Sequence, residues 1–260
     1  MTTFHLLLLV WAVSASVMAA VWAVSMRVAN VGYVDVAWAA LMAVAALMAG
    51  AFGQGGELPR LLVALLGSLW GMRLSLHLLV RVLHEPEDGR YQALRAQWSG
   101  SRSRFFVFFQ MQAVVVALFA LPFIAAASRH SPELDGWIVA AVAIWILAVG
   151  GEWLADRQLA AFRADAGNRG KTCRAGLWAW SRHPNYFGEM SFWWGLWLFG
   201  VAAAPALWWT FAGPLAIALM FRFVSLPMIE TRMRERRPAY ADWVARSSLV
   251  LPRPPRSAVE

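Results

Sequence analysis

Polar side chains that could bind a ligand gather in the stretch WSRHPNYFGE, directly before an apolar and Trp-rich run. The polar members of this stretch are Arg182, His183, Asn185, Tyr186 and Glu189. Asn185 and Glu189 are four residues apart, so they share one face of a helix that begins here. The free N–H groups of a first helical turn favour an anion or an acceptor. The stretch predicts a ligand site at the mouth of an apolar helix, although Pro184 beside a Glu is also ordinary helix initiation.

A second charged segment lies earlier in the chain. Asp156 and Arg163 are seven residues apart, which places both on one face of a helix that continues past the apolar run 136–155. Gly167 and the glycine three residues later then stop this helix. We expect this face to point toward the same ligand site.

The C-terminal tail predicts a short amphipathic helix that could cover a site or lie on a membrane surface. Pro238 opens it, and Tyr240, Trp243 and Arg246 follow at spacings of three. Glu230 stands just before this helix, either in an interfacial salt bridge or in a contact with a cofactor.

Ionisable side chains also lie inside apolar segments, where a charge costs at least about 2.5–3.5 kcal/mol at the membrane centre. Asp35 is near the start of one segment, and Arg73 and His77 share a face of the next. Asp35 and Arg73 predict either a buried ion pair or a polar pocket. In a pocket Asp35 would donate a proton, because burial disfavours its charged form; if Arg73 keeps it ionised, that role passes to His77 or Tyr33.

The composition indicates which elements position these side chains. The chain has 260 residues, 60% of them hydrophobic and 15% charged, with 16 Trp and a mean hydropathy of +0.53. This predicts an all-α integral membrane protein whose apolar runs cross about 30 Å of hydrocarbon. The expected spans are residues 4–26, 33–53, 60–80, 105–127, 136–155, 187–204 and 206–226. We expect a single membrane domain over residues 1–260, built as a seven-helix bundle.

The basic residues predict how this bundle is oriented. If the N-terminus lies outside the cell, nineteen of the 23 Lys and Arg residues fall in cytoplasmic segments. Such a bias marks the cytoplasmic side, which places the C-terminus in the cytoplasm and explains the net charge of +8 without nucleic acid. The long cytoplasmic segments are 81–104, 156–186 and 227–260. Within the first, the mixed-charge run EPEDGRY at 85–91 is either a solvated connection or a lid.

Several kinds of site do not fit the sequence. A lone Cys173 without clustered His predicts no metal site, and the glycine motifs of a Rossmann unit or a P-loop are absent. A basic surface above an apolar pocket instead suits a large anionic cofactor and a lipophilic substrate that enters from the bilayer. Membrane lipid and this substrate are the expected partners; the oligomeric state stays open.

The C-terminal half resembles a known family. The runs SRHPNYFGE at 181–189 and DRQLAAFR at 156–163, with Tyr240, Trp243 and Arg246 in the tail, are similar to the DUF1295 family of bacterial membrane proteins. That family lies within the steroid 5-alpha-reductase-like superfamily, and the resemblance extends over most of the chain.

The resemblance implies a fold and a cofactor. Steroid 5-alpha-reductases are seven-helix bundles that bind NADPH between their C-terminal helices. The resemblance implies cofactor contacts for Asn185, Gly188, Glu189, Asp156 and Arg163. The whole set expected to hold the cofactor is Arg73, Asp156, Arg163, Arg182, His183, Asn185, Tyr186, Glu189, Glu230, Tyr240 and Arg246. At the reacting end the chain differs from those reductases, which use a Glu beside a Gln in helix two and a Tyr in helix three. Here helix two offers Asp35, and helix three offers Arg73 and His77.

Two activities follow from the resemblance. The first is an NADPH-dependent reductase similar to 3-oxo-5-alpha-steroid 4-dehydrogenases, which act on CH–CH groups: hydride passes to the β-carbon of a lipophilic conjugated carbonyl. The alternative is an S-adenosylmethionine-dependent methyltransferase of the isoprenylcysteine type, whose RHPxY motif fits residues 182–186. A transporter is a third class, without a visible inverted repeat. For the enzyme we expect the bacterial inner membrane, with the active site facing the cytoplasm.

Overall fold

The protein is built from helices. The computed structural model describes residues 1–130, 134–237 and 239–254, and within these ranges every regular element is an α-, 3-10 or π-helix. This confirms the all-α class. Six helices of the described chain are long and apolar enough to cross a membrane, as an integral membrane protein requires. They are Thr3–Val28, Tyr33–Phe52, Glu57–His84, Arg102–Ala126, Gly136–Ala164 and Pro205–Arg236.

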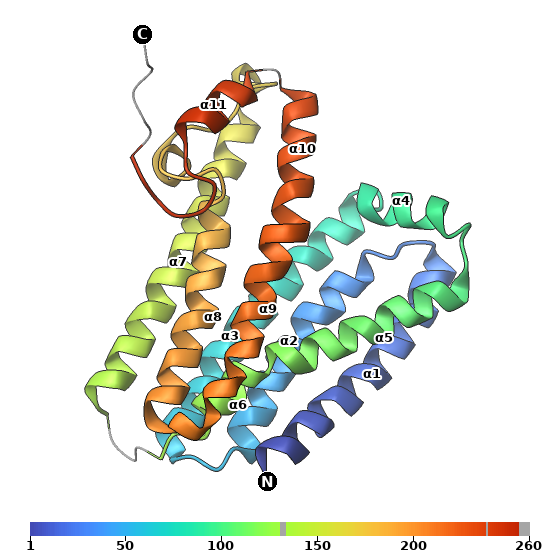
Figure 1. Cartoon of the computed structure of the whole chain (residues 1–260). Helices are drawn as coiled ribbons and strands as arrows, with labels where there is room; N and C mark the ends of the chain where they lie inside the picture. Colours follow the sequence, from blue (N-terminus) through green and yellow to red (C-terminus); the bar gives the residue numbers. More distant parts are fainter. Residues whose placement is uncertain (131–133, 238, 255–260) are drawn as a thin grey trace. The chain divides into compact units, whose positions relative to one another are not determined.

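The element order is shown in Figure 1. The elements are α1 (Thr3–Val28), α2 (Tyr33–Phe52), α3 (Glu57–His84), α4 (Gly89–Gln97), α5 (Arg102–Phe119), α6 (Leu121–Ala126), α7 (Gly136–Ala164), η1 (Ala166–Asn168), η2 (Gly176–Ala179), α8 (Pro184–Ala203), η3 (Pro205–Phe211), α9 (Ala212–Met220), the π-helical turn η4 (Phe221–Ser225), α10 (Leu226–Arg236) and α11 (Tyr240–Arg246). The chain divides into two compact units. The first contains Met1–Asp135 with Trp197–Gly213, and the second contains Gly136–Leu196 with Pro214–Glu260.

The predicted span 187–204 forms a helix, α8, but it is not among the six candidate spans. Polar Asn185 and Glu189 lie in its first turns, and its many Trp and Gly residues contribute little to hydropathy. The predicted count of seven spans is therefore not confirmed, and the side on which each terminus lies stays a prediction. The last predicted span, 206–226, is longer than expected, because the helix continues through a π-helical turn to Arg236.

In the first unit α2 is the central helix and packs against α1, α3, α5 and α6. Small side chains let α2 and α3 approach closely. A Cβ on Gly71 would lie 2.7 Å from the backbone nitrogen of Ala43, and one on Gly67 would lie 2.5 Å from the Cβ of Ala46. Membrane helices pack through such small residues, because lipid tails give them no hydrophobic driving force to associate. This contact fixes the position of Asp35 on α2 relative to the side chains of α3.

In the second unit α7 and α8 meet in the same way. A Cβ on Gly188 would lie 2.7 Å from the carbonyl oxygen of Ala148, and one on Gly195 would lie 2.5 Å from Ile144. The helix α7 continues to Ala164, as the charge spacing predicts. The predicted tail helix is also present as α11, although Pro238 lies outside the described residues.

The close approach of α2 and α3 makes a testable prediction. Gly71→Ala should lower the free energy of unfolding by about 1–3 kcal/mol, because its methyl group would press on the backbone of α2. Thermal unfolding in detergent, followed by size exclusion, measures this. Gly150→Ala on α7 is the matched control, because no atom lies within 4 Å of its added Cβ; equal losses in both variants would contradict the packing described.

Candidate functional site

Charged and hydrogen-bonding side chains form one cluster in each unit. We call the first the Asp35 cluster; its members are Asp35, Arg81, Glu87, Asp88, Arg90, Tyr91 and Arg95. We call the second the Glu230 cluster; its members are Arg182, His183, Glu230 and Tyr240. A separate pair, Asp156 and Asn185, also lies in the second unit.

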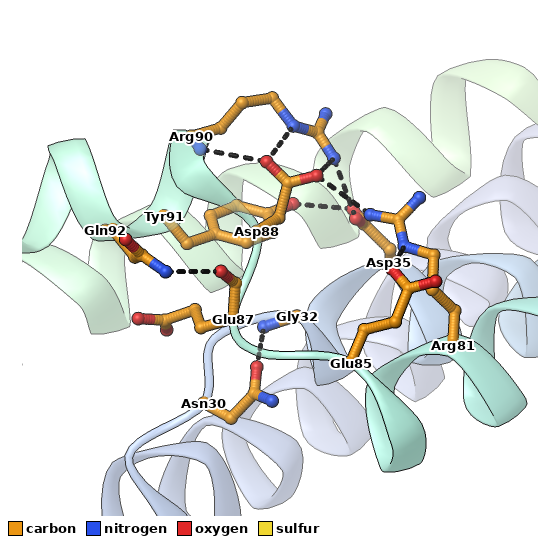
Figure 2. Close-up of polar contacts among 10 residues, drawn as sticks. All are labelled: Asn30, Gly32, Asp35, Arg81, Glu85, Glu87, Asp88, Arg90, Tyr91 and Gln92. Atoms are coloured by element: carbon orange, nitrogen blue, oxygen red, sulfur yellow. Dashed lines mark hydrogen bonds and ion pairs between the residues drawn. The ribbon is translucent and has the colours of Figure 1, made fainter. Parts of the chain in front are cut away.

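Both oxygens of Asp35 accept a hydrogen bond from α4. Tyr91 donates its hydroxyl to Oδ1 at 2.6 Å, and Arg90 donates Nη2 to Oδ2 at 3.2 Å (Figure 2). The Asp35 side chain is 30% exposed, whereas Tyr91 is buried. The ion pair of Asp35 is thus with Arg90, not with the Arg73 considered from sequence. Asp35 therefore acts as a hydrogen-bond acceptor for two donors in this structure. This arrangement does not favour its predicted role as the proton donor.

The segment that carries these donors is itself held by acids. Asp88 caps α4 by accepting from the backbone N–H of Arg90 at 2.8 Å, and it also accepts from Arg81 Nη2 at 2.8 Å. Burial alone would raise the pKa of Asp88, but the hydrogen bonds and charge of Arg90, with the charge of Arg81, hold that pKa below its ordinary value. Glu87 accepts from the backbone N–H of Val31 at 2.7 Å. The run EPEDGRY is therefore fastened to the turn before α2 through Glu87, while Glu85 at its start is exposed.

The hydroxyl of Tyr91 is held in its protonated form. Burial raises the pKa of the Tyr91 hydroxyl, and the nearby charge of Asp35 raises it further. The other predicted donors lie elsewhere in the first unit: Tyr33 is the first residue of α2 and half-buried, and His77 is exposed on α3. Arg73 lies one turn before His77 and is half-buried. Neither Arg90 nor Tyr91 was singled out from the sequence, since nothing in their spacing points to a partner 55 residues away.

In the Glu230 cluster a single carboxylate oxygen collects three donors. Oε1 of Glu230 accepts from Arg182 Nε at 3.0 Å, from His183 Nε2 at 2.8 Å and from Tyr240 OH at 2.6 Å. The side chains of Arg182, His183 and Glu230 are 8%, 7% and 11% exposed. Burial, and then the hydrogen bond to Glu230, raise the pKa of Tyr240. All four were expected to contact a cofactor; in the structure their polar groups satisfy one another.

These contacts dock the tail onto the start of α8. Arg182 Nη1 donates to the carbonyl oxygen of Ser247 at 2.8 Å, and its backbone N–H donates to that of Ser248 at 2.9 Å. The backbone N–H of Arg253 donates to the carbonyl oxygen of Trp180 at 2.9 Å. The RHP motif therefore has a visible structural role, in which Arg182 links α10, α11 and the residues that follow α11.

Asn185 has an unsatisfied acceptor. Its Nδ2 donates to Asp156 Oδ1 at 3.3 Å, which fixes the orientation of the amide because a carboxylate only accepts. Its Oδ1 is buried and has no hydrogen-bond partner among the described residues. Leaving a buried acceptor unpaired costs about 1–3 kcal/mol. This oxygen is thus a place where a ligand donor would be stabilised.

The remaining predicted residues of the second unit are arranged differently. Glu189 accepts from the indole N–H of Trp193 at 2.9 Å, and the Tyr186 ring packs edge-on against His183 and Phe221. Arg246 pairs with Asp242 on the surface of α11.

Basic side chains come together where α7 and α10 end. Burial lowers the pKa of Arg237, and the positive charge of Arg163 nearby lowers it further. Arg236 acts in the same direction, while Tyr240 opposes it. Guanidinium groups that repel one another are stabilised by an anion. The described residues hold no group of three or more His, Cys, Asp or Glu that could bind a metal ion.

The Glu230 cluster predicts an asymmetric pair of mutants. Glu230→Ala should cost about 3–5 kcal/mol of stability, because it leaves Arg182 buried without its anion. Tyr240→Phe should cost only about 0.5–1.5 kcal/mol, since one hydrogen bond is lost. Chemical denaturation of the purified protein measures both. If the Glu230 variant were no less stable than the Tyr240 variant, this carboxylate would not hold the cluster together.

The hydrogen bond between Tyr91 and Asp35 predicts a pH dependence. The pKa of Tyr91 is raised in the folded protein. The stability that its hydroxyl contributes to the fold is therefore fully present below the ordinary pKa of 10.0 and is lost as the pH rises beyond it. Ultraviolet titration of phenolate should show a late phase from Tyr91 and Tyr240, and Tyr91→Phe should remove the signal of one tyrosine from that phase. Loss of absorbance from the phase near pH 10 instead would contradict the assigned hydrogen bond.

Comparisons with known proteins identify the family of the chain. The chain is 26% identical to an uncharacterized protein of Schizosaccharomyces pombe, in an alignment of 247 residues that covers 84% of this chain and 72% of the relative. No solved structure matches it. The profile of the family described as "Protein of unknown function (DUF1295)" matches residues 21–247, which includes both polar clusters. The chain therefore belongs to the DUF1295 family.

Proposed function

We propose that this protein is a membrane-embedded, NADPH-dependent reductase of a lipophilic conjugated carbonyl compound, which enters from the bilayer. The observation that carries the proposal is the unpartnered, buried Oδ1 of Asn185 in the same unit as the like-charged pair Arg163 and Arg237. A ligand that satisfies both needs N–H or O–H donors at one end and strong negative charge at another. The proposal places the enzyme in a bacterial inner membrane with this site facing the cytoplasm.

NADPH has both features. Its amide and ribose hydroxyl groups are donors suited to Asn185, and its phosphates suit the guanidinium groups of Arg163 and Arg237. S-adenosylmethionine offers one carboxylate and carries a net positive charge, so it would relieve the repulsion between these two arginines less than the phosphates of NADPH. This difference favours the reductase over the methyltransferase, which becomes an outcome of the test.

The proposed chemistry needs a hydride source and a group that stabilises charge on the carbonyl oxygen. NADPH, when bound, supplies the hydride. Within the first unit, the hydroxyl of Tyr91 that donates to Asp35 is a group able to give a hydrogen bond or a proton to an oxygen acceptor. Reorientation of this O–H toward a substrate leaves Asp35 paired with Arg90. Tyr33 and His77 remain the alternative donors.

A binding titration of the detergent-purified protein with NADPH and, separately, with S-adenosylmethionine tests the proposal. Saturable binding of NADPH should weaken about tenfold in Asn185→Ala, the worth of about one hydrogen bond to a buried acceptor. Arg163→Ala should weaken it too and reduce its dependence on salt concentration. Arg157→Ala is the matched control, because Arg157 is exposed on the same helix and stacks on Trp153.

Two binding results would contradict the proposed reductase or its cofactor site. Binding of S-adenosylmethionine alone would overturn the reductase and favour the methyltransferase. Binding of NADPH that is insensitive to both Asn185→Ala and Arg163→Ala would mean that the cofactor site lies elsewhere in the chain.

A further inference from the structure

The second unit has an apolar groove that neither cluster uses. It lies between α7 and α8, is closed at one end by η2 and the tail, and has a volume of about 760 Å³. Its lining residues include Ile144, Gly151, Gln158, Trp180, Gly188 and Pro252. Among them is Gly188, for which the resemblance implies a cofactor contact.

Glycines shape this groove. Gly188 brings α8 against α7 and forms the floor, whereas Gly151 leaves space, since no atom lies within 4 Å of an added Cβ there. Gly176 has a positive φ of 59°, and an added Cβ would lie 2.5 Å from the amide of Gln158. The Gln158 side chain also accepts the backbone N–H of Leu177 at 2.9 Å. Together they close one end of the groove with polar atoms.

The groove has the length of a lipid chain. From Ile144 to Gln158 it follows α7 for about 21 Å, at about 1.5 Å per residue. One leaflet contributes half of the roughly 30 Å hydrocarbon core, or about 15 Å. Most of the groove lies on Gly136–Ala164, one of the six helices able to cross a membrane. An apolar chain that runs along α7 therefore fits in both length and surroundings.

The closed end has the composition of a membrane interface. Trp180 is 51% exposed and lines the groove beside Pro252. The next residue, Arg253, is exposed and is fixed there by its backbone hydrogen bond to Trp180. Trp residues prefer the headgroup level, and a cation there attracts anionic lipids.

We propose that this groove binds one acyl chain of an anionic phospholipid, with the lipid phosphate at Arg253. The site holds a structural or regulatory lipid rather than the cofactor, and it does not depend on the activity proposed above. A zwitterionic lipid would fill the apolar part equally well, but the cation of its own headgroup would offset the charge that its phosphate presents to Arg253.

Photo-crosslinking in bilayers tests this proposal. The purified protein is reconstituted into nanodiscs that contain a diazirine-acyl phosphatidylglycerol or, at the same mole fraction, the matching phosphatidylcholine. Mass spectrometry should place the crosslinks on residues 144–151 and 187–191. Phosphatidylglycerol should crosslink about fivefold more, the effect expected of one cation near a membrane surface.

Matched variants separate the groove from its cation. Gly151→Trp fills the groove and should reduce crosslinking at least about tenfold, whereas Gly150→Trp places the same side chain in open space beside it and should not. Arg253→Glu should remove the preference for phosphatidylglycerol while crosslinks to the groove persist; Arg169→Glu, an exposed arginine away from the groove lining, should not. Equal crosslinking in the two glycine variants would overturn the acyl site, and equal crosslinking of both lipids to the unmodified protein would overturn the choice of an anionic headgroup.

Discussion

A carboxylate in or beside hydrocarbon must find donors within its own fold, because water is not there to supply them. Asp35 and Glu230 each lie in a helix able to cross a membrane, and each collects donors from a segment that follows the membrane helices. Asp35 accepts hydrogen bonds from Arg90 and Tyr91 and so binds α4. Glu230 accepts hydrogen bonds from Arg182 and from Tyr240, and the second of these binds the tail. In each unit one acid thereby ties a segment outside the apolar spans to the helices: α4 to Asp35 and the tail to Glu230.

This constraint separates polar groups with a structural role from those available to a ligand. The donors of the Glu230 cluster are already used by Glu230 and by the tail, although their sequence motif is the most recognisable in the chain. Two features differ from this: the Oδ1 of Asn185 has no hydrogen-bond partner among the described residues, and the charge of Arg163 disfavours the charged form of Arg237. A cofactor that brings donors and phosphates would complete them, as the proposed function requires.

Patterns within one segment of the sequence predicted the helices well, whereas contacts between residues far apart in the sequence were harder to predict. The charge spacing of Asp156 and Arg163 predicted that α7 continues past its apolar run, and the tail helix α11 was also expected. The partner of Asp35 was misjudged, because Arg73 is closer in sequence than Arg90 and no periodicity links α2 to α4. The groove depends on the open space at Gly151 and on the close approach of the helices at Gly188. Both residues are glycines, so the sequence does not show which of them leaves space and which lies at a helix contact.

Hydrogen–deuterium exchange of two variants, Asp35→Asn and Glu230→Gln, tests most directly whether these acids hold the outer segments. Each substitution keeps the size of the side chain and removes its charge. The account predicts faster exchange in α4 alone for Asp35→Asn, and in α11 and residues 247–253 alone for Glu230→Gln. Exchange that is unchanged in both variants, or that rises equally in both segments, would contradict the central role of these two carboxylates.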